Sequence, residues 1–227
     1  MIKGEFYAGL DLGQAADPTA LVVLERKVAP KTKTETVWMD TILGRRSIQK
    51  TTQVENPADD EFHVIHIERW RQLSYDVLAG IVQQRLERLE RCTLCLDYTG
   101  VGRPVYDRFV ALGLRPIPIS IHGGNAVNRD GLGWSVPKRD LAASVAVALQ
   151  NKTLQVAQNL PDADILRGEL KNFKVKISAS GRDTYAAGGD WRENPHDDTV
   201  LALAVSLWYA QRHSKRASVV ALPSSWT

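Results

Sequence analysis

Short runs of hydrophobic residues, separated by turn-forming residues, occupy the N-terminal part of the chain and predict strands. Residues 5–12 form the first run, and residues 13–18 follow as a turn because glycine, aspartate and proline punctuate them. Residues 19–26 form a second run, and the short connection between the two runs favours an antiparallel hairpin. Residues 62–68 alternate between hydrophobic and polar side chains and predict a further strand.

The stretch between these strands is more polar. Residues 28–34 are predicted to be a connection and residues 35–43 to be a strand. Residues 44–60 carry many charged and polar side chains and include Pro57. We therefore expect a loop or an insertion at 44–60.

From Ser74 onward the hydrophobic pattern takes on the period of helices, which alternate with short strands. Ser74 suits an N-cap, Gly113 ends the second helix, and Pro137 suits the first turn of the third. The predicted helices are residues 75–91, 101–112, 137–150, 162–171 and 196–211. The predicted strands are residues 93–98, 115–121, 154–156 and 173–177, and a loop is predicted at 123–136. Two prolines in 115–121 indicate an edge strand or an irregular one.

This order of elements predicts an α/β fold. Antiparallel strands come first and parallel strands follow, which indicates a mixed β-sheet flanked by helices. One domain over residues 1–212 is enough to hold these elements. Residues 213–227 are small and polar, and we expect them to form a disordered C-terminal tail.

Composition and charge narrow the class of protein. The chain has 227 residues, of which 44% are hydrophobic and 24% charged, so it can bury a useful core without a disulfide staple. A formal net charge of +3 permits a polyanionic partner without demanding one. Cys92 and Cys95 stand three apart in a predicted strand and should point to opposite faces, which argues against a shared disulfide or zinc site. We find no signal peptide and no membrane-spanning apolar run, so we expect a cytoplasmic protein.

Acidic residues mark three points where predicted elements begin or end. Asp11 lies near the end of the first strand, Asp97 ends the strand after the first helix, and Asp197 and Asp198 open the last helix. A turn or capping role explains each residue singly. The neighbours of Asp11 and Asp97 are apolar, however, and the last helix is apolar nearly all round. We therefore expect these carboxylates to be carried inward together.

Carboxylates gathered in this way point to metal chemistry. A cluster of like charges repels itself and needs cations, and Mg²⁺ takes oxygen ligands from carboxylates, water and substrate phosphate. Two such ions about 4 Å apart can clamp the attacking and leaving oxygens of a phosphodiester. The sequence therefore predicts a centre that holds two divalent cations, Mg²⁺ or Mn²⁺, and it contains no convincing Ser, His or Cys triad.

Three ordered motifs surround these acidic residues. Gly9-Leu-Asp-Leu-Gly13 is followed by Asp17-Pro-Thr-Ala20, the second motif is Leu96-Asp-Tyr-Thr-Gly-Val-Gly102, and the third is His196-Asp-Asp-Thr-Val200. In this order they resemble the motifs of the nuclease domain of tailed-phage terminase large subunits. The resemblance runs from about residue 6 to residue 208, and the ordered set is far more specific than any single motif.

The resemblance implies an RNase H-like fold and a metal-dependent endonuclease that cleaves double-stranded DNA in viral DNA packaging. It implies that Asp11, Asp97 and Asp198 are the catalytic residues and metal ligands. Asp197 is expected to replace or assist Asp198, because the exact start of the last helix decides which of them faces the metal. Asp17 is a further candidate ligand at the rim, although a turn residue is commonly found at such a position.

Further candidates concern DNA and partner proteins. Lys138, Arg139 and His196 are candidate phosphate contacts, and the loop predicted at 44–60 is a candidate contact for DNA or a partner. Complete terminase large subunits also carry an ATPase domain, but G-x-x-x-x-G-K-[ST] does not occur in this sequence. The chain is therefore expected to act with an ATPase domain or subunit and other packaging proteins in the cytoplasm of the bacterial host.

Three other functions stay open at this point. A Holliday-junction resolvase would apply the same chemistry to branched DNA. Gly-Leu-Asp-Leu-Gly after a strand also resembles the phosphate motif of actin-like and sugar-kinase ATPases, but that architecture needs two such domains and this chain is short for it. A non-catalytic packaging accessory would carry a decayed site, and the presence of all four acidic positions argues against decay.

Overall fold

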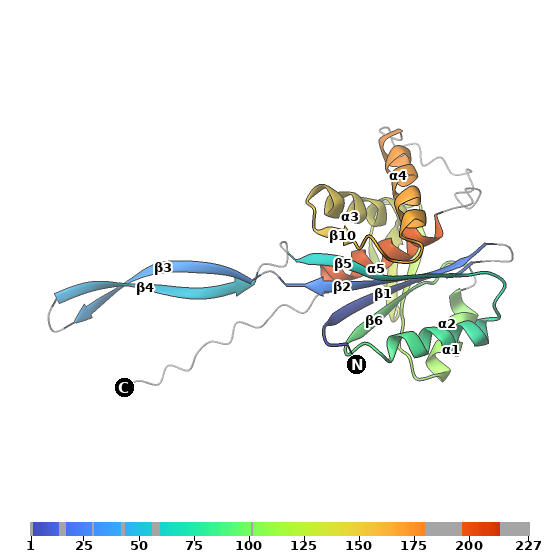
Figure 1. Cartoon of the computed structure of the whole chain (residues 1–227), viewed down its shortest axis with the longest axis horizontal. Coiled ribbons are helices and arrows are strands. Elements are labelled where there is room, and N and C mark those ends of the chain that lie inside the picture. The colour runs from blue at the N-terminus through green and yellow to red at the C-terminus, as the bar shows by residue number, and fades with distance from the viewer. Residues whose placement is uncertain are drawn as a thin grey trace.

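The computed structural model describes residues 2–13, 17–28, 30–41, 44–55, 60–100, 102–179 and 197–213. In this part of the chain, a mixed eight-stranded sheet forms the centre of the fold (Figure 1). Its strands are β1 (Glu5–Asp11), β2 (Thr19–Lys27), β5 (Glu61–Trp70), β6 (Cys92–Asp97), β7 (Ile117–His122), β8 (Asn128–Asp130), β9 (Gly133–Pro137) and β10 (Leu154–Val156). They lie in the order β10-β5-β2-β1-β6-β7-β9-β8.

Strand directions confirm the predicted mixed sheet. β1 pairs with β2, and β2 with β5, in antiparallel orientation. β1 with β6, β6 with β7, and β7 with β9 are parallel pairs. The predicted edge position of the proline-containing strand is wrong, because β7 lies between β6 and β9. Only Pro118 of the two prolines falls within β7, so the ladder loses a single N–H donor.

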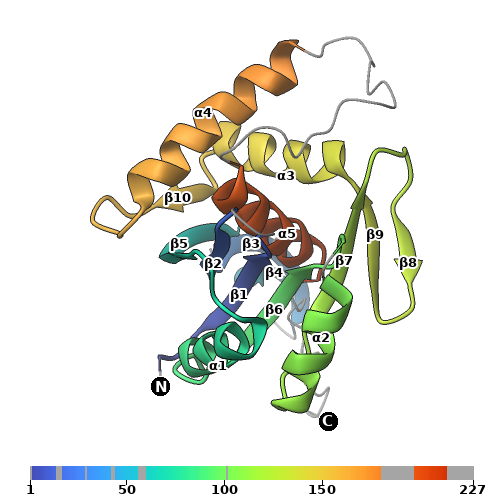
Figure 2. The same ribbon diagram turned by 90° about the vertical axis from the view of Figure 1, so that its right-hand side faces the viewer.

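Helices cover both faces of the sheet (Figure 2). Helices α1 (Tyr75–Leu86) and α2 (Gly102–Ala111) pack on one face, and α3 (Lys138–Gln150), α4 (Ala163–Ala179) and α5 (Asp198–His213) lie on the other. Ser74 caps α1 as predicted, because its hydroxyl accepts a hydrogen bond from the Val77 N–H at 3.4 Å. Within the described ranges, no helix is both long and apolar enough to cross a membrane.

Successive side chains along a strand point to opposite faces of the sheet, so the core consists of two hydrophobic clusters. Tyr7 and Cys95 belong to the cluster beneath α3, α4 and α5, whereas Leu10 and Leu96 belong to the cluster beneath α1 and α2. Cys92 packs against the second cluster and Cys95 lies in the first, and both thiols are free. The prediction that these two cysteines point to opposite faces is confirmed.

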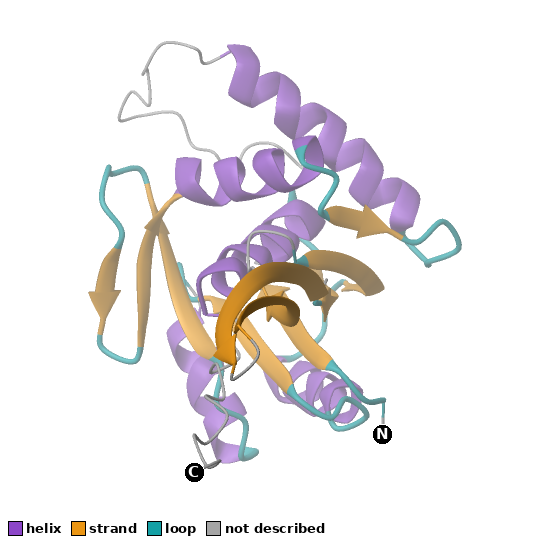
Figure 3. Cartoon of the chain, turned by 90° about the vertical axis from the view of Figure 1, so that its left-hand side faces the viewer, coloured by secondary structure: helices purple, strands orange, loops and turns teal. Residues whose placement is uncertain are grey.

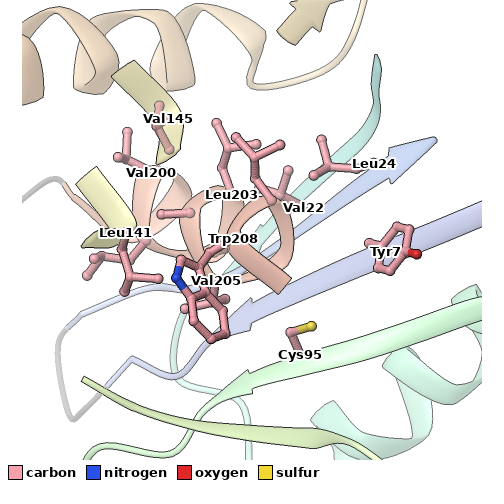
Figure 4. Close-up of a cluster of buried hydrophobic side chains, with 14 of the residues drawn as sticks. Tyr7, Val22, Leu24, Cys95, Leu141, Val145, Val200, Leu203, Val205 and Trp208 are labelled. Carbon is pink, nitrogen blue, oxygen red and sulfur yellow. The ribbon is translucent and has the colours of Figure 1, made fainter. Parts of the chain in front are cut away.

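Helix α5 is the most deeply buried helix and lies directly on the centre of the sheet. Figure 4 shows Leu203 and Trp208 of α5 among side chains that include Val22 and Cys95 of the strands beneath it. The approach is closest at Gly9 of β1, where an added Cβ atom would lie 1.7 Å from the carbonyl oxygen of Ala202. Glycine is therefore required at this position for α5 to rest against the backbone of β1.

A long β-hairpin of β3 (Pro30–Thr41) and β4 (Gly44–Glu55) projects away from the sheet (Figures 1 and 3). The connection predicted at 28–34 is therefore wrong for residues 30–34. Of the two alternatives for residues 44–60, a loop or an insertion, the loop is wrong for residues 44–55, while residues 56–59 lie outside the described residues. Antiparallel main-chain pairing joins the two strands over their whole length. The strand predicted at 35–43 is confirmed for residues 35–41, which belong to β3. The hydrophobic pattern missed β4 because the ribbon does not lie on the core.

Two other assignments differ from the sequence prediction. Strands β8 and β9 occupy part of the loop predicted at 123–136, and the strand predicted at 173–177 is the C-terminal end of α4. Hydrophobic residues alternate at 173–177 as they do in a strand. These residues nevertheless continue α4, because extending an existing helix requires no new nucleation step. The glycine-rich segment 180–196 and the predicted tail after residue 213 lie outside the described residues.

Replacing Gly9 by alanine should destabilise the fold by at least about 1–3 kcal/mol, because the new methyl group would overlap the Ala202 carbonyl. Urea unfolding followed by circular dichroism measures the change. Gly80→Ala in α1 is the matched control, since no heavy atom lies within 4 Å of its added Cβ. The control should gain about 0.5–1 kcal/mol from helix propensity. Equal effects at the two glycines would contradict the close contact between α5 and β1.

Candidate metal centre

Acidic residues gather at one edge of the sheet, where the parallel strands have their C-terminal ends. Asp11 is the last residue of β1 and Asp97 is the last residue of β6. Asp198 is the first residue of α5, which rests on β1 at Gly9. In open α/β sheets this edge is the usual place for a binding site. The fold thus brings together three of the predicted site residues from distant parts of the sequence.

Asp11 and Asp97 lie side by side. Their preceding residues, Leu10 and Leu96, are paired in the parallel register of β1 and β6. Both carboxylates point to the α5 face of the sheet, and their residues are 8% and 5% exposed, respectively. The Thr99 N–H donates a hydrogen bond to Asp97 Oδ1 at 2.8 Å, and Asp97 also shares a side-chain hydrogen bond with Asp11.

Asp198 is held from the other side of the site by Arg69. Arg69 Nη2 donates to Asp198 Oδ2 at 3.2 Å, and both side chains are 16% exposed. Arg69 lies on β5, in the same cross-strand row as Asp11. Asp197 is buried just before α5, where its main-chain carbonyl accepts the Leu201 N–H at 2.9 Å. Of these two aspartates, it is Asp198 whose charge bears strongly on Asp11.

Glu169 is a fourth carboxylate of this region, and sequence reasoning missed it. It projects from α4, is 3% exposed, and accepts hydrogen bonds at Oε2 from the N–H groups of Thr199 at 3.0 Å and Val200 at 3.1 Å. The Thr199 hydroxyl donates to the same oxygen. Glu169 lies on the buried stripe of α4 that also carries Leu166 and Leu170. A charged residue in an apolar helical stripe is the signal that could have revealed it.

Burial and mutual repulsion change the protonation of this cluster. Burial raises the pKa of Asp11 well above its ordinary value, and the nearby charges of Asp97 and Asp198 raise this pKa further. Burial also raises the pKa of Glu169, although its hydrogen bonds from Thr199 and Val200 act in the opposite direction. Protons reduce the repulsion among these carboxylates, and a bound cation would reduce it in the same way.

Carboxylates are the right donors for a hard divalent cation. Among the residues that the structure describes, no group of three or more Asp, Glu, His or Cys side chains is arranged to hold a metal ion as it stands. In this arrangement Asp11 shares a hydrogen bond with Asp97, and Asp198 is paired with Arg69. A cation would therefore have to replace the proton between Asp11 and Asp97 and compete with the Arg69 guanidinium for Asp198.

Of the other predicted residues, some lie among the described residues and His196 does not. Asp17 is exposed in the turn before β2, and His196 is not among the described residues. Lys138 and Arg139 begin α3 at the same edge of the sheet as the carboxylates. Together they line a small hollow with His122, Gly123 and Gly124.

Comparison with known proteins shows a consistent likeness. The family model described as "Terminase RNaseH-like domain" matches residues 37–209. The large terminase nuclease of thermophilic phage G20c is similar at 17% identity with a TM-score of 0.52, covering 91% of this chain and 82% of that chain.

A second structure of the G20c nuclease, with bound magnesium, gives 16% identity and a TM-score of 0.53, covering 89% of this chain and 80% of that chain. The large terminase nuclease domain of Thermus phage P74-26 gives 16% identity and a TM-score of 0.50, covering 91% and 79%. At these identities the structural likeness establishes the fold. Comparison with curated proteins returned no match.

In the presence of EDTA, Asp11→Asn should make the free energy of unfolding depend less on pH. The pKa of Asp11 is higher in the folded than in the unfolded protein, so folding takes up a proton between the two values. The free energy of unfolding of the wild type should therefore fall as the pH rises from about 4 through the folded-state pKa. Urea unfolding at a series of pH values measures this slope. Parallel curves for wild type and variant would show that Asp11 is not the proton-binding group.

Proposed function

This chain belongs to the terminase RNase H-like domain family, and from that premise we propose that it is a divalent-metal-dependent endonuclease that hydrolyses phosphodiester bonds of double-stranded DNA in viral DNA packaging. The observation that carries this proposal is the buried pair of Asp11 and Asp97, with Asp198 close by, at the C-terminal edge of the sheet. Two buried carboxylates in contact are costly unless a proton or a cation lies between them.

Asp11, Asp97 and Asp198 are the proposed metal ligands, with Asp197 assisting at the start of α5 and Asp17 contributing at the rim. Two divalent cations, Mg²⁺ or Mn²⁺, would supply activation of water and stabilisation of the departing 3′ oxygen. The N–H of Thr99 fixes one oxygen of Asp97 and thereby orients its carboxylate toward Asp11. In support, the similar nuclease of phage G20c has been seen with bound magnesium and with bound cobalt.

Basic residues near the carboxylates are suited to hold the DNA backbone. Lys138 and Arg139 are the first two residues of α3, where the positive end of the helix dipole favours phosphate oxygens. His196 directly precedes the acidic pair that opens α5 and is a further proposed phosphate contact. The proposed substrate therefore lies along the edge of the sheet that carries Asp11 and Asp97.

Viral DNA packaging requires more than cleavage. ATP-driven translocation would come from an ATPase domain or subunit, because the chain contains no phosphate-binding loop of the G-x-x-x-x-G-K-[ST] type. We propose that the nuclease acts with such an ATPase and with other packaging proteins. Cleavage of branched junctions in preference to linear duplex would instead indicate a resolvase.

Asp97→Asn should remove DNA cleavage while the fold is retained, because the substitution keeps the hydrogen bond to Thr99 but loses the negative charge. The assay is nicking and linearisation of a supercoiled plasmid in Mn²⁺, Mg²⁺ or EDTA. We expect cleavage by the wild type only in the presence of a divalent metal, and a loss of at least about 100-fold in the variant.

Asp164→Asn serves as the control for this experiment, since its side chain is 97% exposed on α4. It should cleave as the wild type does. Undiminished cleavage by Asp97→Asn would refute the assigned centre. Absence of cleavage by folded wild type in all metals would favour a non-catalytic packaging accessory.

Removing both Lys138 and Arg139 by alanine substitution should weaken DNA binding and its salt dependence together. Each lost phosphate contact should reduce the slope of log affinity against log salt concentration by roughly 0.9. Fluorescence anisotropy with a labelled duplex, measured without divalent metal at several salt concentrations, reports both quantities. Arg88→Ala is the control, because Arg88 is exposed at the end of α1, near the opposite edge of the sheet. A similar loss of slope in the control would show only a general charge effect.

A further inference from the structure

Glu169 is buried where a charge is expensive. The residue is 3% exposed and lies in the stripe of α4 that includes Leu166 and Leu170. An ionised carboxylate rarely occupies such a position unless several groups compensate it. The contacts of its two oxygens should therefore explain why a carboxylate is present here.

One oxygen of Glu169 has a clear structural task. Oε2 accepts the N–H groups of Thr199 and Val200 and the hydroxyl of Thr199, which satisfies donors in the first turn of α5. A neutral glutamine could present an oxygen to the same three donors. Capping of α5 alone therefore does not explain why a carboxylate rather than an amide stands at this position.

The other oxygen has no such task. Oε1 is buried and has no hydrogen-bond partner among the described residues. A carboxylate oxygen has room for two hydrogen bonds or a cation, and an unsatisfied one costs about 1–3 kcal/mol or more when charged. Unsatisfied buried oxygens of this kind call for a ligand that is bound in the working protein.

The position of Glu169 relates this oxygen to the carboxylates at the edge of the sheet. Thr199, which donates a hydrogen bond to Glu169, directly follows Asp198 in the chain. Asp198 Oδ2 in turn lies 3.2 Å from Arg69 Nη2. Glu169 interacts electrostatically with Asp11, Asp198 and Arg69. Counting Asp97 as well, four carboxylates lie in the region of the Arg69 guanidinium, so further positive charge is favourable there.

From the buried, unpartnered oxygen and its place beside Asp198, we infer that Glu169 is an additional carboxylate of the metal centre, and that its Oε1 interacts with a divalent cation directly or through one cation-bound water. This inference rests on the proposed function, because it assumes that Asp11, Asp97 and Asp198 hold the cation. Glu169 then has two roles: Oε2 fixes the start of α5, and Oε1 adds negative charge to the centre.

Isothermal titration calorimetry with Mn²⁺ alone, without DNA, tests the inference on the full chain. Glu169→Gln keeps the side-chain size and one oxygen for the α5 donors but removes the charge and replaces the second oxygen. We expect its Mn²⁺ affinity to fall by about 10–100-fold, as for partners that support metal ligands. Circular dichroism and urea unfolding verify that the variant is folded.

Thr199→Val is the matched control. It removes the hydroxyl that donates to Glu169 Oε2 but leaves the carboxylate and both N–H donors in place. It should lower the free energy of unfolding by roughly 1 kcal/mol, while Mn²⁺ affinity should stay within about twofold of the wild type, a change worth only a few tenths of a kcal/mol. The control therefore separates a contribution to the metal centre from a contribution to the stability of α5.

Each outcome has a distinct meaning. Wild-type Mn²⁺ affinity in Glu169→Gln, with the wild type binding Mn²⁺ and cleaving DNA, would overturn the role of Glu169 and leave the proposed function intact. Failure of the wild type to bind Mn²⁺ would overturn both. If Glu169→Gln does not fold, anomalous diffraction from wild-type crystals soaked in Mn²⁺ decides: an ion bonded to Oε1, or sharing one water with it, supports the inference, and an ion reaching neither overturns it.

Discussion

The architecture depends on one close approach, the contact of α5 with β1 at Gly9. Because Gly9 has no side chain, the backbone of the helix rests directly on the backbone of the strand at Ala202. The helix enters this contact with its first turn pointing at the end of β1, so Asp198 is delivered to the carboxylates of Asp11 and Asp97. A larger residue at position 9 would lift the helix and move Asp198 with it.

Electrostatic repulsion at this edge of the sheet opposes the packing that brings the carboxylates together. Hydrophobic burial of α5 supplies the free energy that holds the helix in place, and the repulsion among the carboxylates subtracts from it. Arg69 offsets part of the cost by pairing with Asp198, and the proton between Asp11 and Asp97 offsets another part. Under the proposed function, a bound cation would offset the remaining repulsion.

Much of this organisation was predictable from the sequence. Continuous hydrophobic runs located β1 and β2, which are buried on both faces, and period-two alternation located β5. Helical periodicity located the helices. The three acidic positions were recognisable because they stand where elements begin or end. β4 left no such signature, since pairing of main-chain groups away from the core requires no hydrophobic pattern. Glu169 escaped because its relation to the site depends on how α4 packs against α5, which local sequence does not encode.

The centre also joins the two ends of the described chain. Asp11 and Asp97 belong to strands that are made before α4 and α5, the helices that carry Glu169 and Asp198. Contacts between residues so distant in sequence form slowly and only after most of the chain is available. During translation the strands can assemble while α5 is still inside the ribosome, and at that stage the carboxylate set is incomplete. A nascent chain at that stage carries no finished centre, so under the proposed function it cannot cut DNA until α5 has been made.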